Sequence, residues 1–448
     1  MSGSIAMGAL GGIRRYGRRR LGTSVLAMAT VGAVVAGVML SGGPVAEASG
    51  SASPYTVLTV AAASGTGVAV DETTNTIYAT DYGLTPGGVS VIDGSTDTVV
   101  ATVRVGPYPV GVAVDESTDT VYVANSTNIP PNTEQGTVSV IDGATNTVTD
   151  TIEVGITPEG VAVDETTDTI YVTNYVSGTV SVIDGATNTV TATVAVGTDP
   201  IGVAVDDNTD TIYVTNHESN TVSVIDGATN TVTATIAMGY VMEGVAVNEN
   251  TDTIYATTGG HLYVIDGATN TVTATVGEGS AAQGVAVDRT TNTVYVTNYG
   301  SNTMSVIDGT SNTVTATVAD CCRPNGVAVD ENTGTIYTAN CDKGCPPTVA
   351  VIITSTVTVS PTSGPAATAV TVSGRGFNPG ETIKITYKTG LASPKQVTIC
   401  TTTAASDTSY TCSGTIPLAA TAGTNGAHKI LAKGLTSGIK VHTTYTLT

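Results

Sequence analysis

The sequence predicts an all-β protein in which a seven-bladed β-propeller is followed by a small β-sandwich. Two observations predict the propeller: the segment GVAV recurs seven times, and two distances within each repeat are constant. The composition agrees, because the 448 residues include no Trp, one Phe and 51 Gly, and only 12% are charged. The core must therefore use Val, Ile, Ala and Tyr, which favour strands.

The constant distances define one structural unit. Each GVAV glycine is followed after 11 residues by a Tyr, and each Asp of an IDG turn is followed after 18 residues by the next GVAV glycine. Only the connection between the Tyr strand and the IDG turn changes in length. The glycines are Gly67, Gly111, Gly160, Gly202, Gly244, Gly284 and Gly326.

One full unit, residues 160–197, contains four runs with period-2 alternation, which we name strands A (GVAV), B (TIYVTN), C (TVSVID) and D (TVTATV). Asp, Asn and Gly separate the runs, as tight turns require. Four strands in about 42 residues are typical of one propeller blade.

The repeat count also predicts how the ring closes. Seven GVAV segments accompany only six IDG turns, so the unit that begins at Gly326 has no strand D of its own. Residues 55–60 read as a strand D that precedes every other strand. We therefore predict that this amino-terminal strand completes the last blade, within a propeller domain of residues 49–353.

Residues 1–48 resemble an export signal in their organisation. Five arginines precede the uncharged apolar stretch 21–40, and Ala46 and Ala48 form a small-x-small cleavage site, so we predict cleavage after Ala48. An uncleaved membrane anchor is the alternative, since about 20 apolar residues can span a bilayer. With cleavage, we expect a secreted, extracellular or cell-surface protein and no membrane span.

Charge is divided between the two domains. The chain has a net charge of −21, which disfavours binding to nucleic acid. Residues 354–448 carry seven basic and two acidic residues, whereas the propeller carries four basic and 34 acidic ones. The lysines of this second domain could dock on the propeller or on an anionic cell-envelope polymer; an ordinary solvated surface is the alternative. They are Lys384, Lys388, Lys395, Lys429, Lys433 and Lys440.

The six cysteines are expected to form disulfides, because an exported chain favours them. Cys400 and Cys412 flank a predicted hairpin in residues 354–448, where short strands with Pro and Gly turns predict the β-sandwich. Two further bridges are predicted in the last blade. A zinc site is their alternative, although adjacent cysteines suit it poorly. These four residues are Cys321, Cys322, Cys341 and Cys345.

In a propeller, the D-to-A and B-to-C loops share one face and the A-to-B and C-to-D turns share the other. The variable loops therefore gather on a predicted recognition face. At its centre, the residue before GVAV is a carboxylate or amide in four of seven copies: Glu159, Glu243, Gln283 and Asn325. These oxygen donors could hold Ca²⁺ or Mg²⁺, or they could be solvated loop ends; no other cofactor is expected. On the opposite face, Asp164, Glu165 and Asp168 are explained by turn capping, with Ca²⁺ binding as the alternative.

Two segments of the sequence each resemble a known family. YVTN at 171–174 and 213–216, beside GVAV and VIDGATNTV, resembles the YVTN-family β-propeller repeat of bacterial and archaeal surface proteins. That resemblance covers roughly residues 55–353 and implies a seven-bladed propeller, with little about activity. The segment SPTSGPAATAVTVSGRGFNPGE resembles the start of IPT/TIG-like immunoglobulin-like modules, with Phe377 as the apolar anchor.

These observations favour a non-enzymatic binding protein with an unknown protein or glycan ligand on the variable-loop face. No GxSxG, HExxH or phosphate-binding Gly-rich loop occurs. The alternative is a divalent-cation-dependent propeller lactonase or lyase with its site at the channel mouth.

Overall fold

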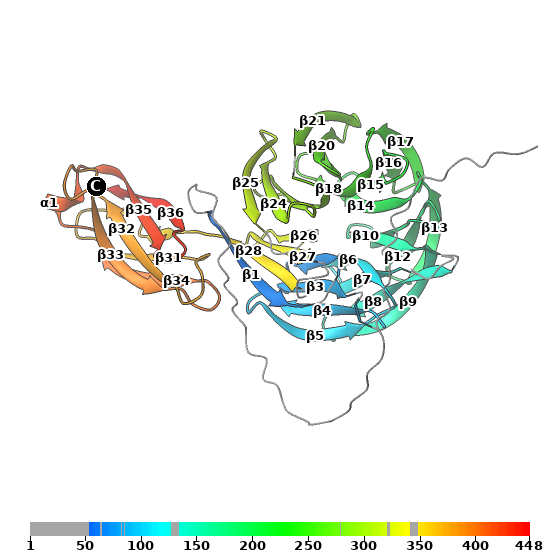
Figure 1. Ribbon diagram of the computed structural model, residues 1–448, viewed down its shortest axis with the longest axis horizontal. Coiled ribbons are helices and arrows are strands. Elements are labelled where there is room, and N and C mark those ends of the chain that lie inside the picture. Colours follow the sequence, from blue (N-terminus) through cyan, green and yellow to red (C-terminus); the bar gives the residue numbers. More distant parts are fainter. Residues whose placement is uncertain are drawn as a thin grey trace, which may run out of the picture. The chain divides into compact units, whose positions relative to one another are not determined.

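The computed structural model describes residues 53–62, 65–81, 83–84, 86–126, 134–277, 279–319, 323–340 and 348–448. These residues form an all-β protein whose helix α1 (Ala419–Ala422) is a single turn (Figure 1). The predicted leader 1–48, with its cleavage position, lies outside the described residues.

Repeated antiparallel sheets of four strands make up residues 55–354. Six of these sheets each use four consecutive strands, as the repeat predicts. The first three contain β2 (Val68–Asp71), β3 (Thr76–Asp81), β4 (Gly88–Asp93) and β5 (Thr98–Arg104); β6 (Pro109–Asp115), β7 (Thr120–Asn125), β8 (Gln135–Asp142) and β9 (Thr147–Ile156); and β10 (Pro158–Asp164), β11 (Thr169–Asn174), β12 (Thr179–Asp184) and β13 (Thr189–Ala195). The next three contain β14 (Pro200–Asp206), β15 (Thr211–Asn216), β16 (Thr221–Asp226) and β17 (Thr231–Ala237); β18 (Met242–Asn248), β19 (Thr253–Thr258), β20 (His261–Asp266) and β21 (Thr271–Gly277); and β22 (Ala282–Asp288), β23 (Thr293–Asn298), β24 (Thr303–Asp308) and β25 (Thr313–Ala319).

One further four-stranded sheet joins the two ends of the repeat region. It contains β26 (Pro324–Asp330), β27 (Thr335–Asn340), β28 (Thr348–Thr354) and, at its outer edge, β1 (Tyr55–Ala61). β1 runs antiparallel to β28, from the pair Tyr55 and Thr354 to the pair Ala61 and Thr348. The outer strand of this sheet therefore comes from the start of the described chain, about 290 residues before its partner.

The sheets follow one another around a closed ring (Figure 1). The first strand of each sheet contacts the first strand of the next, from β2 through β6, β10, β14, β18 and β22 to β26. β26 then contacts β2, so the series has no free end.

Glycine allows these innermost strands to approach one another. A Cβ added to Gly160 would lie 2.4 Å from the carbonyl oxygen of Ile201 in the next sheet. The corresponding glycine of every sheet meets the next sheet's backbone in the same way, at 2.3–2.9 Å. Any side chain here would push two backbones apart, so the position requires glycine.

A threonine hydroxyl adds a hydrogen bond across the same junction. Thr173 Oγ1 accepts from Gly160 N–H at 2.8 Å and donates to Ile201 O at 2.7 Å. The same bridge occurs at Thr80, Thr215, Thr257 and Thr297. Ala124 and Ala339 occupy the equivalent positions in the two remaining sheets, so those two junctions lack it.

Apolar side chains fill the space between neighbouring sheets. Tyr171, which is 1% exposed, packs with Val180 of its own sheet and with Val205 and Ile212 of the next. The repeated tyrosine is therefore a core residue between sheets, as the sequence predicts.

Residues 355–448 form a unit with two sheets and one shared core. The three-stranded sheet contains β29 (Thr358–Ser360), β31 (Ala369–Gly374) and β34 (Tyr410–Thr415), and the five-stranded sheet contains β30 (Ser363–Gly364), β36 (Lys440–Leu447), β35 (Gly426–Gly434), β32 (Thr382–Lys388) and β33 (Gln396–Thr403). Phe377, Tyr387 and Ile430 are fully buried in the core between them.

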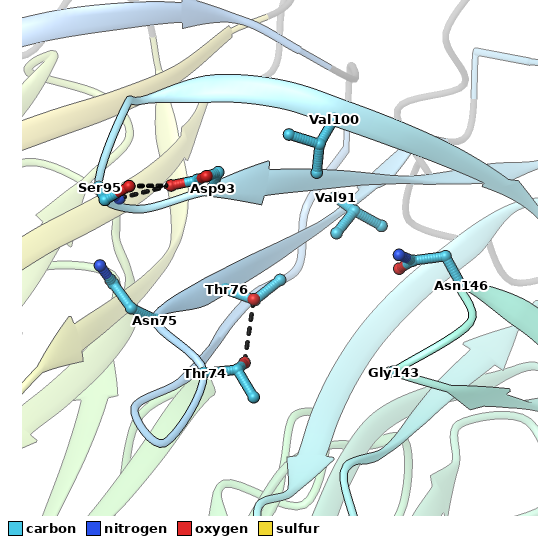
Figure 2. Close-up of a pocket in the computed structure, with 9 residues that line it drawn as sticks. All are labelled: Thr74, Asn75, Thr76, Val91, Asp93, Ser95, Val100, Gly143 and Asn146. Atoms are coloured by element: carbon cyan, nitrogen blue, oxygen red, sulfur yellow. Dashed lines mark hydrogen bonds between the residues drawn. The ribbon is translucent and has the colours of Figure 1, made fainter.

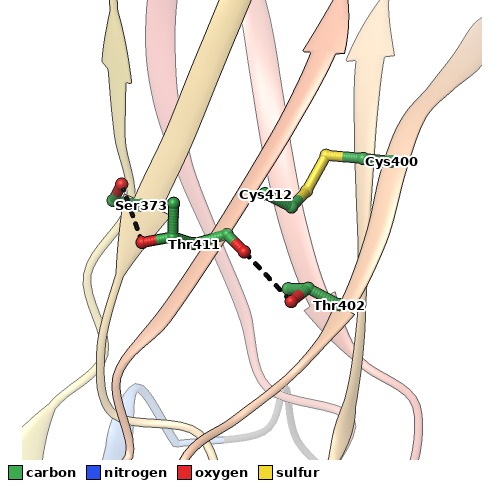
Figure 3. Close-up of a disulfide and its surroundings, with 5 residues drawn as sticks. All are labelled: Ser373, Cys400, Thr402, Thr411 and Cys412. Carbon is green, nitrogen blue, oxygen red and sulfur yellow. Dashed lines mark hydrogen bonds between the residues drawn. A yellow bond between two sulfur atoms is a disulfide. The ribbon is translucent and has the colours of Figure 1, made fainter.

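The predicted disulfide between Cys400 and Cys412 is confirmed (Figure 3). The two cysteines lie on β33 and β34, and their Cα atoms are 6.3 Å apart. These strands belong to different sheets. The sequence predicted that the bond would link the two strands of one hairpin. In the structure it links the two sheets instead.

Deleting residues 49–62 is expected to lower the melting temperature sharply. The deletion removes β1 and leaves β28 as an unpaired edge, while Val351 and Ile353 lose their cover from Val60 and Leu58. Differential scanning calorimetry of this variant, beside a chain that begins at residue 53, measures the effect. An unchanged melting temperature would contradict the role of β1.

Replacing Thr173 with Val is expected to lower the free energy of unfolding by about 1–3 kcal/mol, because Gly160 N–H and Ile201 O lose their shared partner. Thr193→Val is the matched control, since Thr193 is exposed on the outer strand β13. Urea unfolding that gives the same stability for both variants would refute the bridge.

Candidate functional site on the loop face

Backbone hydrogen bonds divide the connections of the ring between two faces. On the first, which we call the loop face, B-to-C loops of the described residues bond the D-to-A loop that leads into their own sheet, as in Tyr175 N to Thr157 O at 2.9 Å and His217 N to Asp199 O at 2.9 Å. On the second, the turn face, each C-to-D turn bonds the A-to-B turn of its own sheet, as in Gly185 N to Asp168 O at 2.8 Å. The connections of each face are therefore hydrogen-bonded to one another.

The turn face repeats one local structure. Asp168 and Asn188 adopt positive φ angles of 52° and 54°, which Asp and Asn tolerate better than most residues. Asp164 Oδ1 accepts from Thr167 N–H at 2.9 Å, and Asp184 Oδ1 from Thr187 N–H at 2.8 Å. The predicted turn capping is therefore confirmed for Asp164, and Asp168 takes a turn conformation. Glu165 differs from the prediction, because its Oε1 accepts from Glu116 N–H of the preceding sheet.

The four residues singled out from the sequence occupy the start of innermost strands on the loop face. Glu159, Glu243, Gln283 and Asn325 are each the second residue of their strand, in β10, β18, β22 and β26. All four side chains are partly buried. Their own carbonyl oxygens meet the glycine of the preceding sheet, so the junction contact fixes the backbone from which each side chain projects.

Glu243 lies in a small polar cluster with residues of two neighbouring sheets. His217 Nδ1 is 3.6 Å from Glu243 Oε1 and 3.0 Å from Met242 O, so this nitrogen carries the hydrogen. Gln283 contributes a side-chain hydrogen bond to the carboxylate. Desolvation by burial raises the pKa of Glu243, and the contacts with His217 and Gln283 oppose that rise.

Glu159 stands apart from this cluster. Among the described residues its carboxyl group has neither a hydrogen-bond nor an ion-pair partner. Desolvation by burial raises the pKa of Glu159 to about 7. A carboxyl group that is half protonated near neutral pH can donate or accept a hydrogen bond, which suits it to bind a hydroxyl group.

Aromatic side chains on the loop face were missed by the sequence reasoning. Tyr240 is 58% exposed, and its ring centroid is 6.1 Å from that of His261. The guanidinium of Arg323 lies 5.2 Å from the centroid of the Tyr299 ring. One signal was available in the sequence: the residue after each strand B changes between repeats, and includes Tyr175, His217 and Tyr299.

The turn face carries a belt of carboxylates around the innermost strands. Glu116 Oε1 accepts from Glu72 N–H at 3.0 Å, and Glu165 Oε1 accepts from Glu116 N–H at 3.2 Å, so each side chain bonds the preceding sheet. Arg289 joins Glu249 at 3.2 Å and Glu331 at 2.7 Å. These carboxylates therefore serve the contacts between sheets.

Two grooves also open on the turn face, at equivalent junctions between sheets. One, of about 350 Å³, is lined by Thr74, Asn75 and Asp93 of one sheet and by Gly143 and Asn146 of the next (Figure 2). The other, of about 210 Å³, has the matching residues of a later pair of sheets, including Thr209, Asp226 and Asn270. Both grooves are lined mainly by polar residues of the repeated turns, so they follow from the repeat itself.

The remaining sequence predictions concern metal-binding clusters, cysteine bridges and membrane spans. Within them, no group of three or more His, Cys, Asp or Glu side chains is placed to hold a metal ion. The predicted bridges of Cys321, Cys322, Cys341 and Cys345 lie outside the described residues. In the same described ranges, no helix is long and apolar enough to cross a membrane.

Comparisons with known proteins define the class of fold. No family model and no curated protein matches the sequence. Among solved structures, a chain of hydrazine synthase from Kuenenia stuttgartiensis is similar, with a TM-score of 0.56 and 17% sequence identity over 62% of this chain and 92% of that one. At this identity the likeness concerns the fold alone. With the repeated four-stranded sheets, it identifies a β-propeller-like repeat protein.

Replacing Glu159 with Gln is expected to increase stability above pH 7. Burial raises the pKa of Glu159 to about 7 in the folded state, against about 4.3 in the unfolded chain. The folded protein is therefore most stable below about pH 4.3, where Glu159 is protonated in both states, and it loses stability as the pH rises to about 7. The variant should remove that loss, worth up to about 3 kcal/mol. Melting temperatures between pH 4 and about 8 test this, with Glu153→Gln as the exposed control. Parallel pH profiles for wild type and E159Q would contradict the assignment.

Proposed function

We propose that this chain is an exported or cell-surface binding protein that uses a seven-bladed β-propeller of the YVTN type as a platform and does not catalyse a reaction. The closed ring of sheets supports the propeller. A two-sheet unit with one core and an inter-sheet disulfide supports an immunoglobulin-like module of the IPT/TIG type as spacer or attachment domain. The disulfide and the predicted leader favour export.

One observation carries the binding role: the turns on one face repeat a single capped structure, while the loop face differs from sheet to sheet. Identical turns preserve a scaffold, and connections that differ between matching repeats are where a ligand surface is built. The strands that bear the longest connections, β7 and β27, end at the equivalent residues Asn125 and Asn340, so both connections start on the loop face.

The side chains of the loop face favour a glycan as the ligand. Exposed Tyr240 with His261 offers aromatic rings to the apolar side of a sugar, and Glu243 with Gln283 offers a carboxylate and an amide to its hydroxyl groups. Glu159 adds a carboxyl group whose hydrogen-bonding capacity is unused within the described residues. Two other functions compete with glycan binding. They are the binding of a protein ligand and cation-dependent catalysis by a lactonase or lyase.

A glycan array probed with the labelled full-length chain, in calcium and in EDTA, tests the proposal. We expect binding to one class of oligosaccharide, reduced at least tenfold by Tyr240→Ala and by Glu243→Ala, and unchanged by Thr74→Ala on the turn face. No binding to any glycan would contradict the glycan proposal. Hydrolysis of a lactone panel by calcium-loaded protein, abolished by Glu243→Ala, would overturn the non-catalytic assignment.

A further inference from the structure

The lysines of the two-sheet unit gather on one face of its five-stranded sheet. Along β32, Ile383, Ile385 and Tyr387 enter the core, so Lys384 and Lys388 point to the other side. β35 alternates in the same way, with Ile430 and Ala432 inside. The outward face that results, which we call the lysine face, carries Lys384, Lys388, Lys429, Lys433 and Lys440.

Strand register places three of these lysines in one row. Lys384 on β32 lies directly opposite Lys433 on β35, and Lys433 lies directly opposite Lys440 on β36. Neighbouring strands are about 4.8 Å apart, so the three lysines leave the backbone of the sheet at about that spacing. Like charges directly opposite one another destabilise a sheet. The row therefore has a cost in the isolated chain that an anionic ligand would remove.

No side-chain carboxylate of residues 354–448 forms an ion pair with the lysine face. The only acidic residues of 354–448 are Glu381 and Asp407. Glu381 is 5% exposed and accepts from Thr436 N–H at 2.8 Å, while Asp407 accepts from Ser409 Oγ at 2.6 Å. Across the described part of the chain, none of the five lysines forms an ion pair. The positive charge of this face is therefore open to an external ligand.

We propose that the lysine face is a binding surface for a linear polymer of phosphate groups. A row of closely spaced positive charges complements a chain of closely spaced negative ones. The donors are lysine ammonium groups and threonine hydroxyls, such as Thr401 opposite Lys384, which are typical phosphate contacts. No arginine lies on the strands of this face, so lysine ammonium groups supply its charge. A second copy of the chain is a poorer partner, because each copy has a net charge of −21.

This inference rests on the attachment role proposed for the second domain, and it is independent of the glycan site on the loop face. If the test of polymer binding fails, the glycan proposal for the loop face is unaffected, and the reverse also holds. Tyr240→Ala, which should reduce glycan binding, is expected to leave polymer binding unchanged.

Fluorescence anisotropy of the full-length chain with labelled long-chain inorganic polyphosphate, over a range of salt concentrations, tests the proposal. The triple variant Lys384→Gln, Lys433→Gln, Lys440→Gln should weaken binding by about tenfold or more. It should also reduce the slope of log affinity against log salt by roughly two to three. Its melting temperature should equal or exceed that of the wild type, because the row of like charges is gone.

The matched control changes net charge by the same amount in the repeated sheets, outside the two-sheet unit. Thr193→Glu, Thr235→Glu and Thr275→Glu lie on exposed positions of the outer strands β13, β17 and β21. This control should bind polyphosphate within about twofold of the wild type. Equal losses in both triple variants would overturn the proposal. Equal affinity of the wild type for polyglutamate and for polyphosphate would also overturn it. A third contradicting result is that polyphosphate fails to bind while the chain self-associates in a salt-sensitive way that the lysine variant abolishes.

Discussion

The contact between innermost strands is the constraint on which the ring depends. A glycine without a Cβ lets each strand meet the carbonyl oxygen of the next sheet, and a threonine of strand B bridges the same two backbones in five of the sheets. Because the contact is repeated at every junction, one spacing is imposed around the whole circle. Closure then follows from β1, whose pairing with β28 gives the last sheet its fourth strand.

That constraint separates the parts of the repeat that must stay constant from those that are free to change. Gly160 and Thr173 fix the junction, and Asp164 caps the turn that follows the same strand, so these residue types recur. The side chain of Glu159 projects from the fixed backbone without serving the junction, and it varies from sheet to sheet. The candidate site therefore consists of variable side chains on an invariant frame, which is the arrangement expected of a binding platform.

Periodic features of the structure could be predicted from the sequence, and features that depend on register or on a neighbouring sheet could not. Constant spacing predicted the repeated sheets and the buried Tyr171, and the export argument predicted the bond between Cys400 and Cys412. The cluster of Glu243 with His217 was missed because these residues meet across a junction, 26 positions apart. The lysine row was missed as well, since Lys384, Lys433 and Lys440 are scattered in the sequence and only strand pairing aligns them.

Substitution of the junction glycine tests the central claim most directly. In Gly160→Ala the new methyl group would lie 2.4 Å from Ile201 O, whereas Gly277 on the outer strand β21 has nothing within 4 Å of the same position. Denaturant unfolding should therefore show a loss of about 1–3 kcal/mol for Gly160→Ala and little change for Gly277→Ala. Equal stability of the two variants would contradict the account, because it would mean that close approach of the innermost strands does not hold the ring together.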